Sequence, residues 1–342
     1  MRIAVISSPV TPLLPAQAGG AQSVLTDLAL GLQNRGHDVT VYCAEGSKVE
    51  GVALFTVPLP ADAGVALVQP AGAPPPATPG VRAALEAIFE AVAKRRPDAV
   101  SQHAFDAPAF DLAEGLPVLH TLHLPPIVPA VVAAAAAFPP QRLATVSKAC
   151  RESWAKAGVD VGRVIPNGVA EVEVGEPVVE PVALVAGRLS PEKGIDHALL
   201  AARAAGLAVR LAGAVYDRDY EVDLQGVERL GALPRDELRR VMARSAVTIC
   251  AARWDEPFGL VAAEAQMAGC PVAAYRRGGL PEVIEDAVSG CLARPDDVDD
   301  LAAAIGRCLT LDRAGVRASA RGRLALGRMV DAYEAALSEI TR

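Results

Sequence analysis

The chain has 342 residues, a formal net charge of −7 and a composition that is 51% hydrophobic but only 4% aromatic. This length exceeds what one hydrophobic core usually serves, so two domains are expected. The negative charge argues against a nucleic-acid partner, because such binding depends on many cations gathered on one face. A small anionic ligand needs only local positive charge.

The first 45 residues carry the pattern of a strand, a helix and a second strand. Apolar runs at Ile3–Ile6 and Val39–Tyr42 predict strands, and apolar residues at helical spacing from Val24 to Leu32 predict an amphipathic helix. Gly36 can occupy the left-handed position that ends such a helix. A βαβ unit of this kind implies a parallel sheet.

The rest of the first half continues the alternation. The proline-rich stretch from Pro70 to Pro79 is expected to be a surface loop, because proline is excluded from helix interiors and central strands. Further elements are predicted at Val81–Lys94 (helix), Ala99–Val100, Val118–His123 and Leu143–Val146 (strands). Short apolar strands suit a sheet that helices cover on both faces. Residues 1–168 are therefore interpreted as one doubly wound domain.

A turn at Pro166-Asn167-Gly168 and an acidic linker up to Glu180 separate a second series of elements. The predicted strands are 182–185, 208–212, 247–250 and 271–275, and the predicted helices are 194–205, 235–243 and 259–268. Residues 169–324 are interpreted as a second αβ domain. The amphipathic tail Leu324–Leu337 predicts a last helix within 325–342, which is expected to complete the first domain.

No signal peptide or bilayer-spanning apolar stretch is recognisable, and the six cysteines form no C-x-x-C pair. A cytoplasmic protein with reduced, buried cysteines is expected. Nothing in the sequence indicates an oligomeric state.

The stretch from Trp254 to Pro271, WDEPFGLVAAEAQMAGCP, is the most informative one. A turn opens into a helix here, so the amides of Phe258, Gly259 and Leu260 are expected at a helix amino terminus, which attracts anions and polar oxygens. Glu256 precedes this terminus, and Glu264 lies about one turn inside the helix. The two carboxylates could reach opposite ends of one elongated ligand, or they could merely cap a helix and face solvent.

The segment GRLSPEKG at 187–194 follows a predicted strand and precedes a helix. Arg188 and Lys193 are thus expected at the carboxyl edge of a parallel sheet, where open αβ sheets bind their ligands. Two cations at this edge suit a diphosphate, although two solvated loop charges would give the same pattern.

Glycines and histidines mark the corresponding edge of the first domain. Gly19 and Gly20 precede the first helix and would allow a ligand to approach the backbone closely. They lack the G-x-G-x-x-G spacing of dinucleotide-binding folds, and this absence argues against a dehydrogenase. His123 ends a predicted strand at the edge that faces the expected interdomain cleft, and His120 should point differently.

Taken together, these motifs resemble the retaining glycosyltransferases of the GT-B fold, glycosyltransferase family 4. The resemblance covers nearly the whole chain and rests on elements that occur in order: Gly19-Gly20-Ala21, Arg35-Gly36-His37-Asp38-Val39, Thr121-Leu122-His123, Val146-Ser147-Lys148, Ile165-Pro166-Asn167-Gly168-Val169, GRLSPEKG at 187–194, Glu256-Pro257-Phe258-Gly259-Leu260 and Glu264. The spacing of Glu256 and Glu264 is the most specific of these. The implied fold is GT-B, two Rossmann-like parallel-sheet domains with a cleft between them.

The resemblance also implies roles on the donor side. Arg188 and Lys193 would hold the donor diphosphate and stabilise the leaving nucleotide, Glu256 would engage the transferred sugar, and Glu264 would bind the ribose hydroxyls. The amides after Glu256, those of Phe258, Gly259 and Leu260, would meet sugar or phosphate oxygens. Gly187 and Leu230-Gly231 are expected beside the donor, the latter pair near its base.

For the amino-terminal domain, the resemblance implies that His123 approaches the sugar and that Gly19-Gly20 lets the domain close over the donor. Ser101 stands where the family commonly has a histidine, and Ala170 replaces a common acidic residue. Neither departure removes a charge needed at a diphosphate.

The predicted function is therefore the transfer of a sugar from a nucleoside diphosphate sugar to an acceptor hydroxyl, without a metal or another cofactor. Cations at the diphosphate can supply the stabilisation that a metal would otherwise give. Retention is implied by the resemblance alone, UDP is only its commonest nucleotide, and the acceptor could be a small molecule, as in antibiotic biosynthesis, or a glycan. A nucleotide-sugar epimerase of the same architecture and a catalytically silent nucleotide-sugar-binding protein remain the alternatives.

Overall fold

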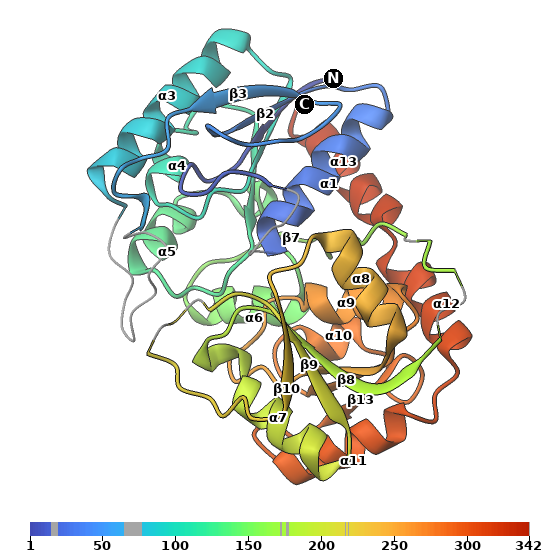
Figure 1. Cartoon of the computed structure of the whole chain (residues 1–342). Helices are drawn as coiled ribbons and strands as arrows, with labels where there is room; N and C mark the ends of the chain where they lie inside the picture. The colour runs from blue at the N-terminus through green and yellow to red at the C-terminus, as the bar shows by residue number, and fades with distance from the viewer. Residues whose placement is uncertain are drawn as a thin grey trace. The chain divides into compact units, whose positions relative to one another are not determined.

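The computed structural model describes residues 1–14, 20–64, 77–171, 173–175, 178–215, 217 and 219–341. These residues form two compact units (Figure 1). Unit 1 contains the described residues up to Pro166 and those from Leu326 onward, and unit 2 contains the residues from Asn167 to Ala325. The sequence analysis places the first limit after residue 168 and the second after residue 324.

Unit 1 is built on a seven-stranded sheet in the order β3-β2-β1-β4-β5-β6-β7, and every neighbouring pair is parallel. The strands are β1 (Arg2–Ile6), β2 (Asp38–Ala44), β3 (Ala53–Val57), β4 (Ala99–Gln102), β5 (Val118–Leu122), β6 (Leu143–Thr145) and β7 (Arg163–Val164). The helices are α1 (Gly20–Asn34), α3 (Pro79–Arg95), α4 (Pro108–Asp111), α5 (Pro129–Ala136), α6 (Lys148–Lys156) and α13 (Leu326–Ile340), with the 3-10 turn η1 (Pro140–Arg142).

The proline-rich loop ends one residue earlier than predicted. Pro79 is the first residue of α3, and Thr78 caps this helix by accepting a hydrogen bond from the Val81 amide at 3.4 Å. Proline suits the first helical position, because its fixed φ is helical and its missing N–H would be unpaired there anyway. Residues 70–76 of the predicted loop lie outside the described residues.

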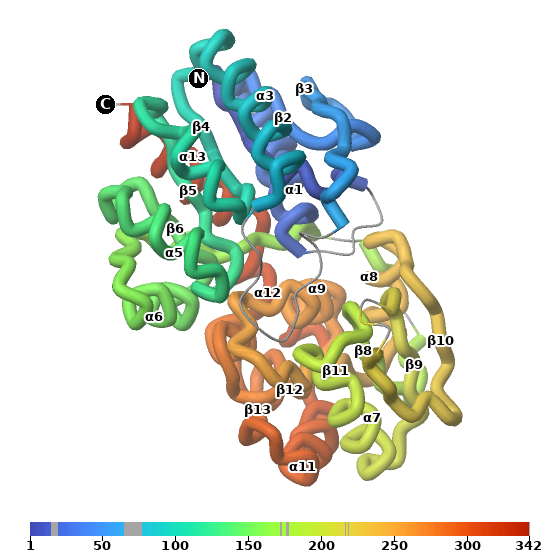
Figure 2. The backbone as a smooth tube through the Cα atoms, turned by 90° about the vertical axis from the view of Figure 1, so that its left-hand side faces the viewer, coloured from blue at the N-terminus to red at the C-terminus, as the bar shows by residue number. Residues whose placement is uncertain are grey.

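The last helix, α13, packs on unit 1, as the sequence analysis expects of the tail. In Figure 2 it runs beside β4 and β5, and in Figure 1 it lies next to α1. Gly31 of α1 makes the close approach of the two helices possible, because a Cβ there would lie 2.5 Å from Cγ2 of Val330. The chain therefore returns from unit 2 to finish the first fold.

Unit 2 is built on a six-stranded parallel sheet in the order β10-β9-β8-β11-β12-β13 (Figure 2). The strands are β8 (Glu180–Ala186), β9 (Ala208–Ala212), β10 (Val227–Gly231), β11 (Ser245–Cys250), β12 (Val272–Tyr275) and β13 (Gly290–Ala293). The helices are α7 (Ile195–Ala204), α8 (Arg235–Arg244), α9 (Leu260–Met267), α10 (Leu280–Val283), α11 (Val298–Cys308) and α12 (Arg313–Leu324), with the 3-10 turn η2 (Pro191–Lys193).

Aliphatic residues form the core of unit 2. The apolar faces of α7 and α11 pack with β8, β9, β11, β12 and β13 in one cluster, and among its buried members in the described part of the chain Tyr275 is the only aromatic residue. The two places where the chain leaves this unit are tied together, because the Val169 amide donates a hydrogen bond to the Leu324 carbonyl at 2.8 Å. All six cysteines of the chain are free thiols, and five of them are buried.

Candidate active site

Three glycines bring the ends of β8, β9 and β10 into backbone contact at the carboxyl edge of the unit 2 sheet. The Gly187 amide donates to Ala212 at 2.9 Å, and the Gly213 amide donates to Gly231 at 2.7 Å. A Cβ on Gly213 would lie 1.8 Å from the Gly187 carbonyl oxygen, so no larger residue fits. Leu230, which is half-buried, and Gly231 thus lie on the same edge of the sheet as Gly187.

The loop after β8 holds both predicted cations on a rigid backbone. Arg188 pairs with Glu192 at 3.3 Å, and the Ser190 hydroxyl donates to the same carboxylate oxygen at 2.6 Å. Gly194, the left-handed residue before α7 with a φ of 61°, packs against the end of β11, because a Cβ there would lie 2.0 Å from the Ala251 carbonyl oxygen. This close packing fixes the position of Lys193, the residue before Gly194.

Lys193 and Glu256, which are far apart in sequence, form an ion pair. Nζ of Lys193 lies 2.7 Å from Oε2 of Glu256, the Trp254 indole N–H donates to the same oxygen at 2.9 Å, and the side-chain exposures of the pair are 24% and 17%. Burial by itself raises the pKa of the Glu256 carboxyl, but Lys193, Trp254 and Arg188 together hold that pKa below its ordinary value. Glu256 is therefore an ionised, firmly oriented hydrogen-bond acceptor at neutral pH.

A second loop supports the backbone around Glu256. The Gly279 amide donates to the Glu256 carbonyl at 2.7 Å, and a Cβ on Gly278 would lie 2.4 Å from that same carbonyl oxygen. The chain then turns through Gly259, whose φ is 101°, into α9. Gly278 and Gly279 thus fix the path of the chain from Glu256 to the start of α9.

The start of α9 presents backbone donors. The sequence analysis begins this helix at Gly259, whereas the structure begins it at Leu260, because the left-handed Gly259 is the residue before the first helical one. Among the described residues, the amides of Phe258, Gly259 and Leu260 have no hydrogen-bond acceptor. The Phe258 ring is buried and Leu260 is half-buried, so these two residues offer their backbone more than their side chains.

Glu264, the second predicted carboxylate, is held by two arginines of the neighbouring helix α8. Its Oε1 lies 2.6 Å from Nε of Arg235 and 3.3 Å from Nη2 of Arg239, and the residue is only 8% exposed. It therefore does not simply face solvent. The sequence analysis predicts the helix that begins near Arg235 but misses this pairing, although two arginines four residues apart on one helix face could have indicated an anionic partner.

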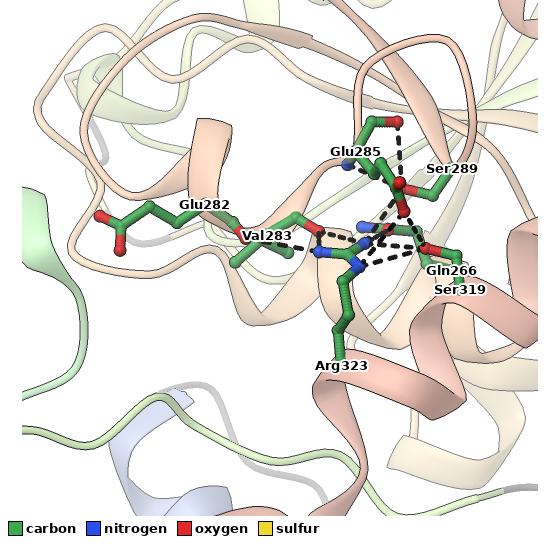
Figure 3. Close-up of polar contacts among 7 residues, drawn as sticks. All are labelled: Gln266, Glu282, Val283, Glu285, Ser289, Ser319 and Arg323. Atoms are coloured by element: carbon green, nitrogen blue, oxygen red, sulfur yellow. Dashed lines mark hydrogen bonds and ion pairs between the residues drawn. The ribbon is translucent and has the colours of Figure 1, made fainter.

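The other end of α9 is fastened by Arg323 of α12 (Figure 3). Both terminal nitrogens of Arg323 donate to the Val283 carbonyl at 3.1 Å, one of them also reaches Oε1 of Gln266 at 3.4 Å, and Nε lies 3.5 Å from the Glu285 carboxylate. This arginine links α12, α9, the end of α10 and the segment after it. The sequence analysis does not identify it.

In unit 1, His123 comes at the end of β5 and belongs to a buried polar cluster. Nε2 of His123 lies 2.8 Å from Nδ1 of His103, and Nε2 of His103 lies 2.8 Å from the Ser101 hydroxyl. Burial lowers the pKa of His123 to about 4, and burial followed by the charge of His123 lowers the pKa of His103 well below its ordinary value. Both rings are therefore neutral at physiological pH.

His120 points elsewhere, as its spacing predicts. Its ring lies against Phe110 and Phe138, with centroids 4.5 and 4.4 Å away, and burial lowers its pKa to about 3. It is a core residue. Gly20, the other residue predicted at this edge, is exposed and begins α1, while Gly19 lies outside the described residues.

Two family models match consecutive parts of the chain. The model described as Glycosyltransferase Family 4 matches residues 18–171, and the model described as Glycosyl transferases group 1 matches residues 170–324. The chain belongs to glycosyltransferase family 4. Together the two models cover both units, and the recognition of the family from its motifs is confirmed.

Curated relatives of this family 4 chain include D-inositol 3-phosphate glycosyltransferases of actinobacteria. That of Mycobacteroides abscessus is 35% identical over 173 residues, 46% of this chain and 39% of the relative. That of Mycolicibacterium smegmatis is 34% identical over 199 residues, 53% of this chain and 46% of the relative. Each alignment thus spans less than half the length of the relative.

Solved structures confirm the GT-B fold of this family 4 chain over nearly its whole length. HepE of Anabaena, in complex with UDP-glucose, has a TM-score of 0.74 at 21% identity and covers 99% of this chain and 100% of its own. AviGT4, a glycosyltransferase involved in avilamycin A biosynthesis, has a TM-score of 0.71 at 21% identity, with coverages of 99% and 98%. No helix of the described residues has the length and apolar character needed to cross a membrane.

Proposed function

We propose that the chain is a glycosyltransferase that moves a sugar from a nucleoside diphosphate sugar, with UDP as the favoured nucleotide, to an acceptor hydroxyl with retention of configuration. The ion pair of Lys193 and Glu256 carries this proposal. It places a cation suited to a diphosphate 2.7 Å from an ionised carboxylate suited to sugar hydroxyls, beside the amino terminus of α9.

The charged groups of unit 2 divide the donor among them. A lysine ammonium has three N–H donors, so Lys193 can bind a phosphate oxygen while it holds Glu256. Arg188 adds a second cation on the same loop, and Glu256 accepts hydrogen bonds from the transferred sugar. Glu264 takes the ribose hydroxyls, at the position where Arg235 and Arg239 hold its carboxylate.

The glycines and amides at the same edge complete the donor site. Gly187 and Leu230-Gly231 leave room for the nucleoside beside the ends of β8 and β10, and the amides of Phe258, Gly259 and Leu260 bind sugar or phosphate oxygens. In unit 1, His123 offers a ring nitrogen to a substrate hydroxyl, and Gly19-Gly20 allows close approach of the backbone to the donor.

The chemistry that follows is electrostatic. As the anomeric C–O bond breaks, positive charge develops on the sugar and negative charge on the diphosphate, which Arg188 and Lys193 stabilise without a metal. The acceptor hydroxyl attacks the same face, and its proton passes to the departing phosphate oxygen. Trapping of a glycosyl adduct on Glu256 would overturn this same-face path and favour a covalent intermediate.

The first test is the thermal stability of the full chain with UDP, GDP, dTDP or ADP in EDTA. At 100 times its dissociation constant a ligand stabilises the folded protein by about 2.7 kcal/mol, a shift of roughly 5–10 °C for a unit of this size. Variant Arg188→Ala/Lys193→Ala should lose the shift. The matched control Arg203→Ala/Arg244→Ala removes two charges whose partners are Asp223 and Glu180, and should keep it.

Each outcome is decisive. A shift with UDP that the first variant loses supports the donor site, and a shift with another nucleotide replaces UDP as the donor. If no nucleotide shifts the thermal transition, the result favours a catalytically silent protein and the proposal is wrong. Release of UDP from a UDP-sugar only when an acceptor is added separates a transferase from an epimerase.

A further inference from the structure

We propose that Ser101 is a positioning residue that fixes the tautomer of His123, so that His123 presents an Nδ1–H donor, and not a lone pair, to a substrate oxygen. The inference deepens the role proposed for His123 and rests on the proposed function only for the identity of that oxygen. The tautomer itself is a property of the protein alone.

The three side chains form a continuous chain of hydrogen bonds. The Ser101 hydroxyl lies 2.8 Å from Nε2 of His103, and Nδ1 of His103 lies 2.8 Å from Nε2 of His123. A neutral imidazole carries one N–H and one lone pair, and burial keeps both rings neutral. Whichever way the first proton points, the other two protons must therefore follow.

Only two arrangements satisfy both imidazole contacts. In the first, Ser101 donates to His103, His103 donates from Nδ1 to Nε2 of His123, and His123 carries its own proton on Nδ1. In the second, His123 donates to His103, His103 donates to Ser101, and Nδ1 of His123 is a bare lone pair. The first makes His123 a hydrogen-bond donor to a ligand, and the second makes it an acceptor or base.

The surroundings of Ser101 select the first arrangement. Ser101 is 0% exposed, and within the part of the chain that the structure describes its hydroxyl has no partner other than Nε2 of His103. In the second arrangement the hydroxyl proton would be buried without an acceptor, which is costly. In the first arrangement the proton is donated to His103, and only the lone pairs of the serine oxygen stay unpaired, which proteins tolerate better.

His123 is also the member of the chain that can meet a ligand. It keeps 8% of its surface exposed, whereas Ser101 keeps none, and its Nδ1 has no partner among the described residues. A donor at this atom matches a sugar hydroxyl or phosphate oxygen, and it excludes His123 as the base that deprotonates the acceptor. Acceptor deprotonation by the departing phosphate needs no such base.

The test is a long-range ¹H–¹⁵N correlation spectrum of the imidazole nitrogens of the ¹⁵N-labelled full chain, which distinguishes protonated from bare ring nitrogens. The chain has only five histidines, and His123→Gln assigns the signals of His123. We expect wild-type His123 and His103 to carry their protons on Nδ1. A proton on Nε2 of His123 would overturn the inference without any reference to activity.

Variants then test the role of the hydroxyl. In Ser101→Ala, Nε2 of His103 loses its partner: the first direction leaves a lone pair unpaired there and the second leaves an N–H unpaired. The hydroxyl no longer contributes to the preference, so the Nδ1–H fraction of His123 should fall. Ser101→Cys, whose S–H is a weak donor, should lie between the alanine variant and wild type, and it decides the question if the alanine variant does not fold. An unchanged fraction in either variant contradicts the proposal.

The matched control is Thr121→Val. It removes a buried hydroxyl of the same sheet, but that hydroxyl pairs with Tyr333 at 3.1 Å and not with an imidazole. The tautomer should be unchanged. If the proposed function holds, Ser101→Ala lowers kcat/KM about tenfold, the size expected for one hydrogen bond, without changing the UDP-dependent thermal shift. If UDP does not shift the thermal transition of the wild-type chain, the proposed donor site is wrong, but the tautomer result still stands.

Discussion

Replacing Gly278 by alanine should distort the proposed donor site through the backbone of Glu256. Gly278 has a φ of 56°, and a Cβ added there would lie 2.4 Å from the Glu256 carbonyl oxygen and 2.5 Å from its amide nitrogen. Both neighbours are backbone atoms, so the contact cannot be relieved by a rotamer change. The loop that leads to α9 must move.

Two costs add at this position. The left-handed region costs a residue other than glycine about 1–2 kcal/mol, and overpacking adds about 1–3 kcal/mol, so Gly278→Ala should destabilise unit 2 by about 2–5 kcal/mol. The matched control is Gly306→Ala in α11, where an added Cβ meets nothing within 4 Å. There alanine should stabilise the helix by about 0.5–1 kcal/mol.

Fluorescence can follow unit 2 by itself, because the two tryptophans lie in different units. In a Trp154→Phe background, Trp254 beside Glu256 is the only remaining fluorophore of this kind. Urea midpoints with Trp254 as the probe give the change in stability, and UDP titration gives the change in affinity. If Gly278→Ala keeps the wild-type midpoint and affinity, the argument from backbone contact is wrong.

Further variants address the charges. Lys193→Met and Glu256→Gln should each lower the free energy of unfolding of unit 2 by about 1–3 kcal/mol, and the double variant should lose less than the sum of the two. If the losses measured from the urea midpoints are additive, the two side chains, 2.7 Å apart, are not coupled. Glu264→Gln leaves Arg235 and Arg239 without their carboxylate and should lower the free energy of unfolding, measured in urea, by about 3 kcal/mol. A loss below about 1 kcal/mol would contradict the pairing. His120 is neutral in the folded state down to about pH 3, whereas an unfolded histidine gains its proton near pH 6.5, so stability should fall as pH drops below about 6.5. His120→Phe should remove about 1.4 kcal/mol per pH unit of that slope, and an unchanged slope between pH 6.5 and 4.5 would refute it.

Local pattern was enough to predict the principal strands and helices, because buried parallel strands are continuous apolar runs and the helices between them are amphipathic. The elements that it missed include several helices, the longest of which are α11 (Val298–Cys308) and α12 (Arg313–Leu324), and the short strands β3, β7, β10 and β13. β3 (Ala53–Val57) is mostly exposed at the edge of its sheet, β7 has two residues, and β13 (Gly290–Ala293) has four. These short segments are strands because they pair with a neighbouring strand, and the pattern of apolar residues along the chain does not reveal that pairing.

In the candidate site too, the sequence predicts individual residues but not the contacts that depend on the fold. Motifs single out Lys193, Glu256 and Glu264, but their partners depend on which loops the sheet brings together. The pairing of Lys193 with Glu256 follows from the adjacency of β8 and β11, and that of Glu264 with Arg239 from the packing of α8 against α9. Neither adjacency can be read from spacing along the chain.

For the retaining transfer proposed above, the state of Glu256 bears on the choice between a covalent path and same-face attack by the acceptor. A covalent path needs a carboxylate that attacks the anomeric carbon, and a group held by Lys193 at 2.7 Å and by the Trp254 indole at 2.9 Å is a poor nucleophile because its charge is already compensated. The lowered pKa of Glu256 also makes it a weak base. Both properties suit the role proposed for Glu256, the orientation of sugar hydroxyls, and they agree with the proposed path in which the acceptor is the nucleophile and the departing phosphate receives its proton.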